Sequence, residues 1–76
     1  MKTYQKPLIN PDKLRDFRAT RALSQRDLAA RAGVTQFTIS RIERSEGISV
    51  RPKTVRALCD ALGCEPQDLY LAEDAE

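Results

Sequence analysis

The chain has 76 residues, enough for one small domain and too few for a second domain or a deep catalytic cleft. A hydrophobic content of 41% with 32% charged residues is typical of a globular chain. There is no His, and the two cysteines, Cys59 and Cys64, are too few to hold a metal. The sequence therefore predicts no metal and no cofactor, and both thiols fit apolar core positions.

Basic and acidic residues are unevenly distributed along the chain. Residues 1–64 hold all 13 Lys and Arg against six acidic residues, a net charge of +7. Residues 65–76 hold five acidic residues and no basic one, a net charge of −5. Nine of the 13 bases are Arg, whose forked guanidinium suits phosphate and guanine. Composition leaves two interpretations open: a body that attracts a polyanion, or an ordinary solvated surface with a solubilising acidic end.

The pattern along the chain divides it into three parts. Residues 1–9 show no helical period and predict a flexible N-terminal arm, in which Lys2 and Lys6 are available to a partner. Residues 10–72 are the predicted domain, and residues 73–76 are an acidic C-terminal tail.

Two short helices are predicted to follow the arm. The first begins behind the capping residue Asn10 and ends near Arg21. The second begins behind Ser24, with Asp27 completing a capping box, and ends at Gly33, where a left-handed conformation costs little. Their inward faces are expected to hold Leu14, Phe17, Ala22, Leu28, Ala29 and Ala32.

Three more helices complete the predicted fold. Thr35 caps a helix that ends near Arg44, Pro52 opens a helix that Gly63 closes, and Pro66 opens a short last helix. The buried positions of these three helices are expected to be Ile39, Ile42, Val55, Leu58, Cys59, Leu62, Leu69 and Leu71. No segment shows a credible strand pattern, so the predicted fold class is all-α, a compact bundle of five helices.

The segment from Gln25 to Arg44 reads QRDLAARAGVTQFTISRIER and predicts a helix-turn-helix. Two helices cross closely at about 90–120° only where small residues and a short turn permit it, and Ala29 and Gly33 meet these two needs. The outward residues of the helix that follows the turn, the third of the chain, are Gln36, Phe37, Ser40, Arg41 and Arg44. They offer hydrogen-bonding groups for base edges, a ring for thymine methyls and guanidinium groups for guanine or phosphate, whereas the alternative is a merely solvated face.

The run LSQRDLAARAGVTQFTISRIER, with PKTVRALCDALGCEPQDLYL further on, resembles the lambda repressor/Cro-like (XRE) helix-turn-helix family. The resemblance extends from Leu14 to Leu71, about three quarters of the chain. The matching motifs are SQxxLA from Ser24, AGV from Ala32, TQ from Thr35, IxRIE from Ile39 and ALG from Ala61. The resemblance implies a five-helix domain that places its third helix in the major groove of DNA, as a homodimer on a palindromic operator.

The resemblance also implies roles for individual residues. The phosphate-binding Gln of the family falls on Gln25, at a helix N-terminus that also presents free N–H groups. The base-reading positions fall on Gln36, Phe37, Ser40 and Arg41. Further candidate DNA contacts, most of them to phosphate, are Thr35, Thr38, Arg44, Arg51 and Lys53. Gln36 suits adenine and Arg41 suits guanine, each pair contributing about 1–3 kcal/mol of discrimination.

An inward-facing carboxylate at Glu43 would be costly without a partner. The family pattern pairs it with an Arg of the first helix, which falls on Arg18, and we interpret the pair as a structural brace. The chain departs from the family where the loop before Pro52 is longer than the common form and where Phe37 is bulkier than the usual polar residue.

Two classes of function fit these observations. The first is a sequence-specific transcriptional regulator of double-stranded DNA, expected to be a repressor and a homodimer, with a regulatory protein as a further partner. The residues expected at the dimer surface are Ile48, Val50, Leu69, Tyr70 and Leu71. The alternative is an antitoxin or adaptor that retains the fold without base reading.

Other classes are not expected. The sequence offers no nucleophile paired with a base and no phosphate-binding Gly loop, so we do not expect an enzyme. It also shows no signal peptide or membrane-length apolar run, so we expect a cytoplasmic location, on the nucleoid when DNA is bound.

Overall fold

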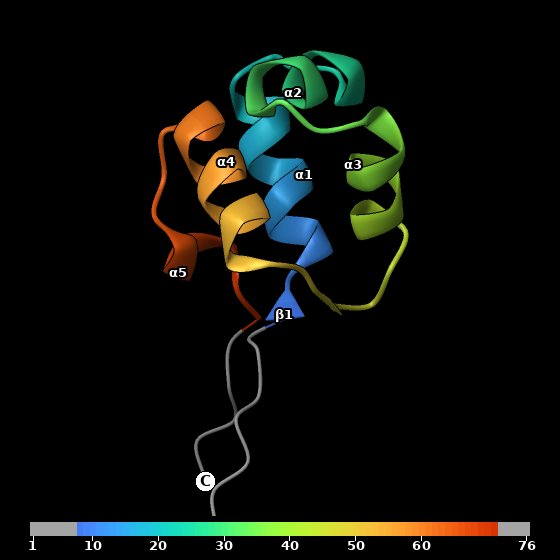
Figure 1. Cartoon of the computed structure of the whole chain (residues 1–76), viewed down its shortest axis with the longest axis vertical. Coiled ribbons are helices and arrows are strands. Elements are labelled where there is room, and N and C mark those ends of the chain that lie inside the picture. The colour runs from blue at the N-terminus through green and yellow to red at the C-terminus, as the bar shows by residue number, and fades with distance from the viewer. Residues whose placement is uncertain (1–7, 72–76) are drawn as a thin grey trace, which may run out of the picture.

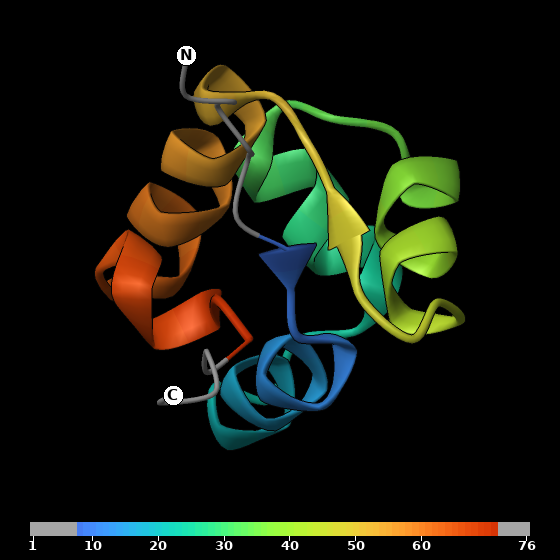
Figure 2. The ribbon, with the colours of Figure 1, turned by 90° about the horizontal axis from the view of Figure 1, so that it is seen from below.

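The computed structural model describes residues 8–71, and the structural statements below concern this part of the chain. Its five helices are α1 (Pro11–Thr20), α2 (Gln25–Ala32), α3 (Gln36–Glu43), α4 (Pro52–Leu62) and α5 (Pro66–Leu69). α2 lies across one end of the molecule (Figure 1). Seen from below, α1, α3 and α4 lie on three different sides of the molecule (Figure 2). The predicted five-helix class is confirmed.

Local capping explains where the first three helices begin. The Asn10 side chain accepts a hydrogen bond from the Asp12 N–H at 2.9 Å. Ser24 Oγ accepts from the Asp27 N–H at 2.9 Å, and the Asp27 carboxylate accepts from the Ser24 N–H at 3.1 Å, which completes the capping box. Thr35 Oγ1 accepts from the Thr38 N–H at 3.1 Å. These side chains satisfy N–H groups that have no partner within a helix.

The core is built from aliphatic side chains of α1 to α5 and of the segment before α1. The largest fully buried side chains are Ile9, Leu14, Leu28, Ile39, Ile42, Leu58 and Leu69. The expectation that Ala22 faces inward is wrong, because α1 ends at Thr20 and the chain turns at Ala22 with φ 55. This turn leaves Ala22 exposed and directs Leu23 into the core instead.

Two short strands correct the prediction that the chain has none. β1 (Leu8–Ile9) pairs antiparallel with β2 (Ile48–Ser49) (Figure 2). Ile9 also forms a bridge with Tyr70. A two-residue strand is too short to show an alternating pattern in the sequence. Leu8 and Ile9, which we assigned to the arm, therefore belong to the folded domain. Residues 1–7 and the predicted tail, 73–76, lie outside the described residues.

The two thiols lie near the end of α4. Cys59 is buried and Cys64 half-buried, and they are not joined in a disulfide. Burial raises the pKa of Cys59 to about 12, so its thiol is neutral near pH 7 and a poor nucleophile. Within residues 8–71 no group of three or more His, Cys, Asp and Glu could hold a metal ion. No helix of that part is long and apolar enough to cross a membrane.

Candidate nucleic-acid interface

α2 and α3 are joined by the short turn that the sequence predicts. Gly33 adopts a left-handed conformation with φ 73, and the Val34 N–H donates to the Ala29 carbonyl at 3.0 Å. Leu28 and Ala29 of α2 are buried in the same cluster as the apolar residues of α3. The segment from Gln25 to Arg44 thus forms a helix-turn-helix packed on one core.

α3 has two sides with different surroundings. Its inner side consists of Ile39, Ile42 and Glu43, which are buried. Its outer side consists of Gln36, Phe37, Arg41 and Arg44, which are exposed. Phe37 is 65% exposed, a high value for a large apolar side chain. Thr38 and Ser40 are half-buried at the edges between the two sides, and the capping residue Thr35 is exposed.

A polar groove of about 420 Å³ lies beside the outer side of α3. It is lined by Thr38, Arg41, Ser49, Val50, Arg51 and Thr54. Three of these, Thr38, Arg41 and Arg51, were candidate DNA contacts, and the fold places Arg51 from the segment before α4 beside the two residues of α3. The combination of two guanidinium groups with three hydroxyl groups can hold a phosphate or a base edge.

Two of the groove residues, Ser49 and Thr54, were not candidates in the sequence analysis. Thr54 had a usable signal, because it lies in the first turn of α4, where N–H groups lack helical partners. Ser49 had none, because its position depends on the pairing of β2 with β1.

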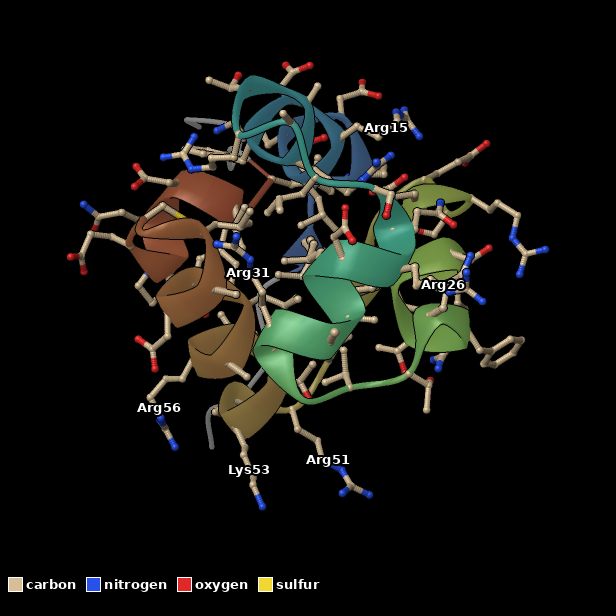
Figure 3. The ribbon with its side chains drawn as sticks, turned by 90° about the horizontal axis from the view of Figure 1, so that it is seen from above. Arg15, Arg26, Arg31, Arg51, Lys53 and Arg56 are labelled. Atoms are coloured by element: carbon tan, nitrogen blue, oxygen red, sulfur yellow. The ribbon has the colours of Figure 1, made fainter. Side chains whose placement is uncertain are left out.

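Other cations surround the interface. Arg51, Lys53 and Arg56 project from the same side of the molecule, whereas Arg26 lies beside α3 (Figure 3). Lys53 is exposed and does not line the groove, although it projects from the same side of the molecule as Arg51 (Figure 3). Arg31 lies toward α4, away from α3 (Figure 3).

Glu43 is the centre of a polar network behind α3. Its side chain is 3% exposed and receives two hydrogen bonds from Arg18, Nε to Oε2 at 2.7 Å and Nη2 to Oε1 at 2.9 Å. Arg18 Nη1 also donates to the Leu23 carbonyl at 2.9 Å. The hydrogen bond to this carboxylate raises the pKa of Arg18. The network joins α1 to α3 and stabilises the buried charge.

Gln25 takes part in the same network. Its Nε2 donates to Glu43 Oε1 at 3.1 Å, which ties the first turn of α2 to the last turn of α3. An amide nitrogen carries two N–H donors, so one remains for the phosphate contact that the resemblance implies. The contact of Gln25 with Glu43 was not predicted from the sequence, because nothing in the local pattern indicates which way the side chain points.

A helix-turn-helix of α2 and α3, braced by α1 and bordered by exposed arginines, defines the class of lambda repressor/Cro-like helix-turn-helix domains. Residues 12–71 match the model of the family described as helix-turn-helix domain, and the chain belongs to that family.

Individual relatives agree with this class. The chain is 33% identical over 51 residues to an uncharacterized HTH-type transcriptional regulator, YozG, of Bacillus subtilis (strain 168). The match covers 67% of this chain and 61% of YozG. Among solved structures, the chain is similar to the restriction-modification controller protein C.AhdI from Aeromonas hydrophila, with a TM-score of 0.70 and 29% identity over 76% of this chain and 86% of C.AhdI.

A repressor domain gives a similar match. The DNA-binding domain of the P22 C2 repressor has a TM-score of 0.69 and 30% identity, over 88% of this chain and 82% of that domain. The resemblance stated from the sequence is therefore confirmed by both sequence and fold.

Proposed function

We propose that the chain is a sequence-specific transcriptional regulator that inserts α3 into the major groove of double-stranded DNA. The observation that carries this proposal is the outer side of α3, where Gln36, Phe37 and Arg41 are exposed beside a groove that holds a second arginine, Arg51. A major groove about 12 Å wide admits a helix, and these side-chain types match base edges.

The proposed contacts divide into base reading and backbone binding. Gln36 and Arg41 read adenine and guanine, Ser40 contacts a base at the edge, and Phe37 packs on a thymine methyl. Arg51 binds a backbone phosphate from the groove. The other proposed contacts to the backbone are the free N–H of Gln25, the hydroxyl groups of Thr35, Thr38, Ser49 and Thr54, and the cations of Arg44 and Lys53.

We further propose that the chain represses transcription in the cytoplasm as a homodimer on a palindromic operator, without enzymatic activity. An α3 of eight residues contacts few base pairs, and a second copy doubles the number of contacts. Among the expected dimer residues, Leu69 is fully buried in the core and is withdrawn. Ile48, Val50, Tyr70 and Leu71 are half-buried and remain candidates, together with Leu8, which is 42% exposed.

The decisive experiment is selection of bound duplexes from a random DNA pool, followed by fluorescence anisotropy on the selected duplex across a salt series. We expect Gln36→Ala and Arg41→Ala each to weaken binding by about 1–3 kcal/mol. We expect Arg51→Ala to reduce the slope of the logarithm of the binding constant against the logarithm of the salt concentration by about one, which corresponds to one counterion. Arg31→Ala is the matched control, because it removes one exposed charge away from α3.

The same experiment separates the regulator from an antitoxin or adaptor that keeps the fold. A salt-independent signal, or binding unchanged in the double variant of Gln36 and Arg41, would overturn the proposal. A symmetric pair of half-sites in the selected sequences supports the homodimer, and a single half-site contradicts it.

A further inference from the structure

The C-terminal end of α3 is held by Arg15, an exposed residue of α1. Arg15 Nη1 donates a hydrogen bond to the main-chain carbonyl of Glu43, the last residue of α3, at 2.7 Å. The last carbonyl groups of a helix lack partners within it, and a cation there also interacts favourably with the helix dipole. Arg15 leaves α1 toward the side of the molecule where α3 lies (Figure 3).

The guanidinium of Arg15 is itself held in place. Its Nη2 binds the Asp12 carboxylate in the first turn of α1, so that one nitrogen is bonded to α1 and the other to α3. Such a fork fixes the plane of the guanidinium group in a way that a single ammonium cannot. Arg18 follows Arg15 by three residues and lies on the same face of α1. The two arginines therefore bind the main chain and the side chain of the same glutamate.

The position of these contacts makes the angle of α3 sensitive to them. Gln36, the first residue of α3, is seven residues from Glu43, a distance of about 10 Å along the helix axis. If Glu43 moved by about 1 Å while Gln36 stayed in place, α3 would tilt by about 6°, and Arg41, which lies between them, would move by about 0.7 Å. Hydrogen bonds to base edges tolerate only a few tenths of an ångström around 2.7–3.2 Å.

We propose that Arg15 is a positioning residue for base reading, which acts by holding Glu43 and thereby fixes the angle at which α3 presents Gln36 and Arg41. This inference rests on the proposed function. The role proposed for Arg15 differs from that of a direct phosphate contact, which would strengthen binding to all DNA sequences equally. Loss of a positioning residue instead reduces the preference for the selected sequence.

The test uses the full chain with the substitution Arg15→Gln and, as the matched control for loss of charge, Arg31→Gln. Binding to the selected duplex and to a scrambled duplex of the same composition is measured by anisotropy. We expect Arg15→Gln to lower the ratio of the two affinities roughly tenfold. Its binding to the scrambled duplex changes only as much as that of Arg31→Gln.

A second substitution, Asp12→Ala, keeps the charge of Arg15 and removes its anchor on α1. We expect it to lower the same ratio while strengthening binding to the scrambled duplex, because a negative charge is lost. A role in stability alone cannot produce this pair of changes. Thermal unfolding of each variant verifies that it is folded at the assay temperature.

The outcomes distinguish the two proposals. If the wild-type chain does not distinguish the selected from the scrambled duplex, the proposed function fails. If the wild type distinguishes them and Arg15→Gln does so equally well, only the role of Arg15 is overturned. An equal loss of affinity for both duplexes in Arg15→Gln also overturns it, because Arg15 is then a plain backbone contact.

Discussion

The inner and outer sides of α3 differ in how their polar groups are satisfied. On the inner side, the Glu43 carboxylate is bonded to Arg18 and Gln25, and its main-chain carbonyl is bonded to Arg15. On the outer side, Arg41 forms no salt bridge within residues 8–71, although it shares a groove with Arg51. The same eight residues thus carry a hydrogen-bonded network on one side and, on the other, one cation, Arg41, that has no salt bridge within residues 8–71.

This difference indicates how the two sides contribute to folding and to binding. Buried polar groups stabilise a structure only when each has its partner, so the inner side belongs to the fold. Like charges that line one groove repel each other and contribute nothing to folding. They become favourable when a polyanion lies between them. We therefore expect inner residues to control stability and outer residues to control binding.

The largest expected effect comes from Arg18→Ala. The substitution leaves the buried Glu43 carboxylate with only the Gln25 amide and removes a donor to the Leu23 carbonyl. Loss of one partner of a buried ion pair costs about 3–5 kcal/mol. We expect the free energy of unfolding of Arg18→Ala, measured by urea denaturation, to fall by this amount. Arg41→Ala on the outer side should change it by less than about 0.5 kcal/mol. If both substitutions cost the same, the two sides of α3 do not differ as we infer.

A somewhat smaller effect is expected from Ile9→Ala. Ile9 is fully buried between β2 and Tyr70, and truncating a buried Ile costs about 2–5 kcal/mol through lost burial and the cavity that remains. Its neighbour Leu8 is 42% exposed and is the matched control, with a much smaller loss on Leu8→Ala. Urea denaturation of both variants measures the difference. If both variants lost only a small and equal amount of unfolding free energy, Ile9 would belong to a loose arm and not to the core.

The sequence predicted those features of the fold that depend on neighbouring residues. Asn10, Ser24 and Thr35 act as caps within three residues of their partners, so the helix boundaries were readable. The exposed side of α3 followed from the helical period. The pairing of Arg18 with Glu43 came from the family resemblance, because no local pattern connects α1 with α3.

The features that the sequence did not predict depend on contacts between distant segments. β1 and β2 are too short for a periodic pattern, and their pairing is what places Ser49 in the groove. The contact from Arg15 ends on a main-chain carbonyl, which every residue has, so no residue type marks it. The direction of the Gln25 side chain depends on the buried charge of Glu43, which only the folded chain provides.

The smallest expected effect concerns Asp27, an exposed residue that nevertheless belongs to the scaffold. Hydrogen bonds from the main chain and the side chain of Ser24 lower the pKa of the Asp27 carboxyl. A lowered pKa means that the ionised carboxylate stabilises the fold above the pKa of the unfolded chain, about 3.9. This contribution is lost as the pH falls through the lower pKa of the folded chain.

Comparison of the wild type with Asp27→Asn isolates this contribution. The difference between their free energies of unfolding should be largest near pH 7 and should disappear at acid pH, because protonated Asp and Asn are both neutral. Urea denaturation at several pH values measures it. Asp16→Asn is the matched control, because Asp16 is also exposed on a helix but its carboxylate forms no hydrogen bond within residues 8–71. A difference for Asp27 that does not change with pH would show that its contribution does not come from charge. Exposure alone separates the scaffold from the binding surface less well than hydrogen bonding does, because Asp27 and Arg41 are both exposed, but within residues 8–71 only the Asp27 side chain has a hydrogen-bonding partner.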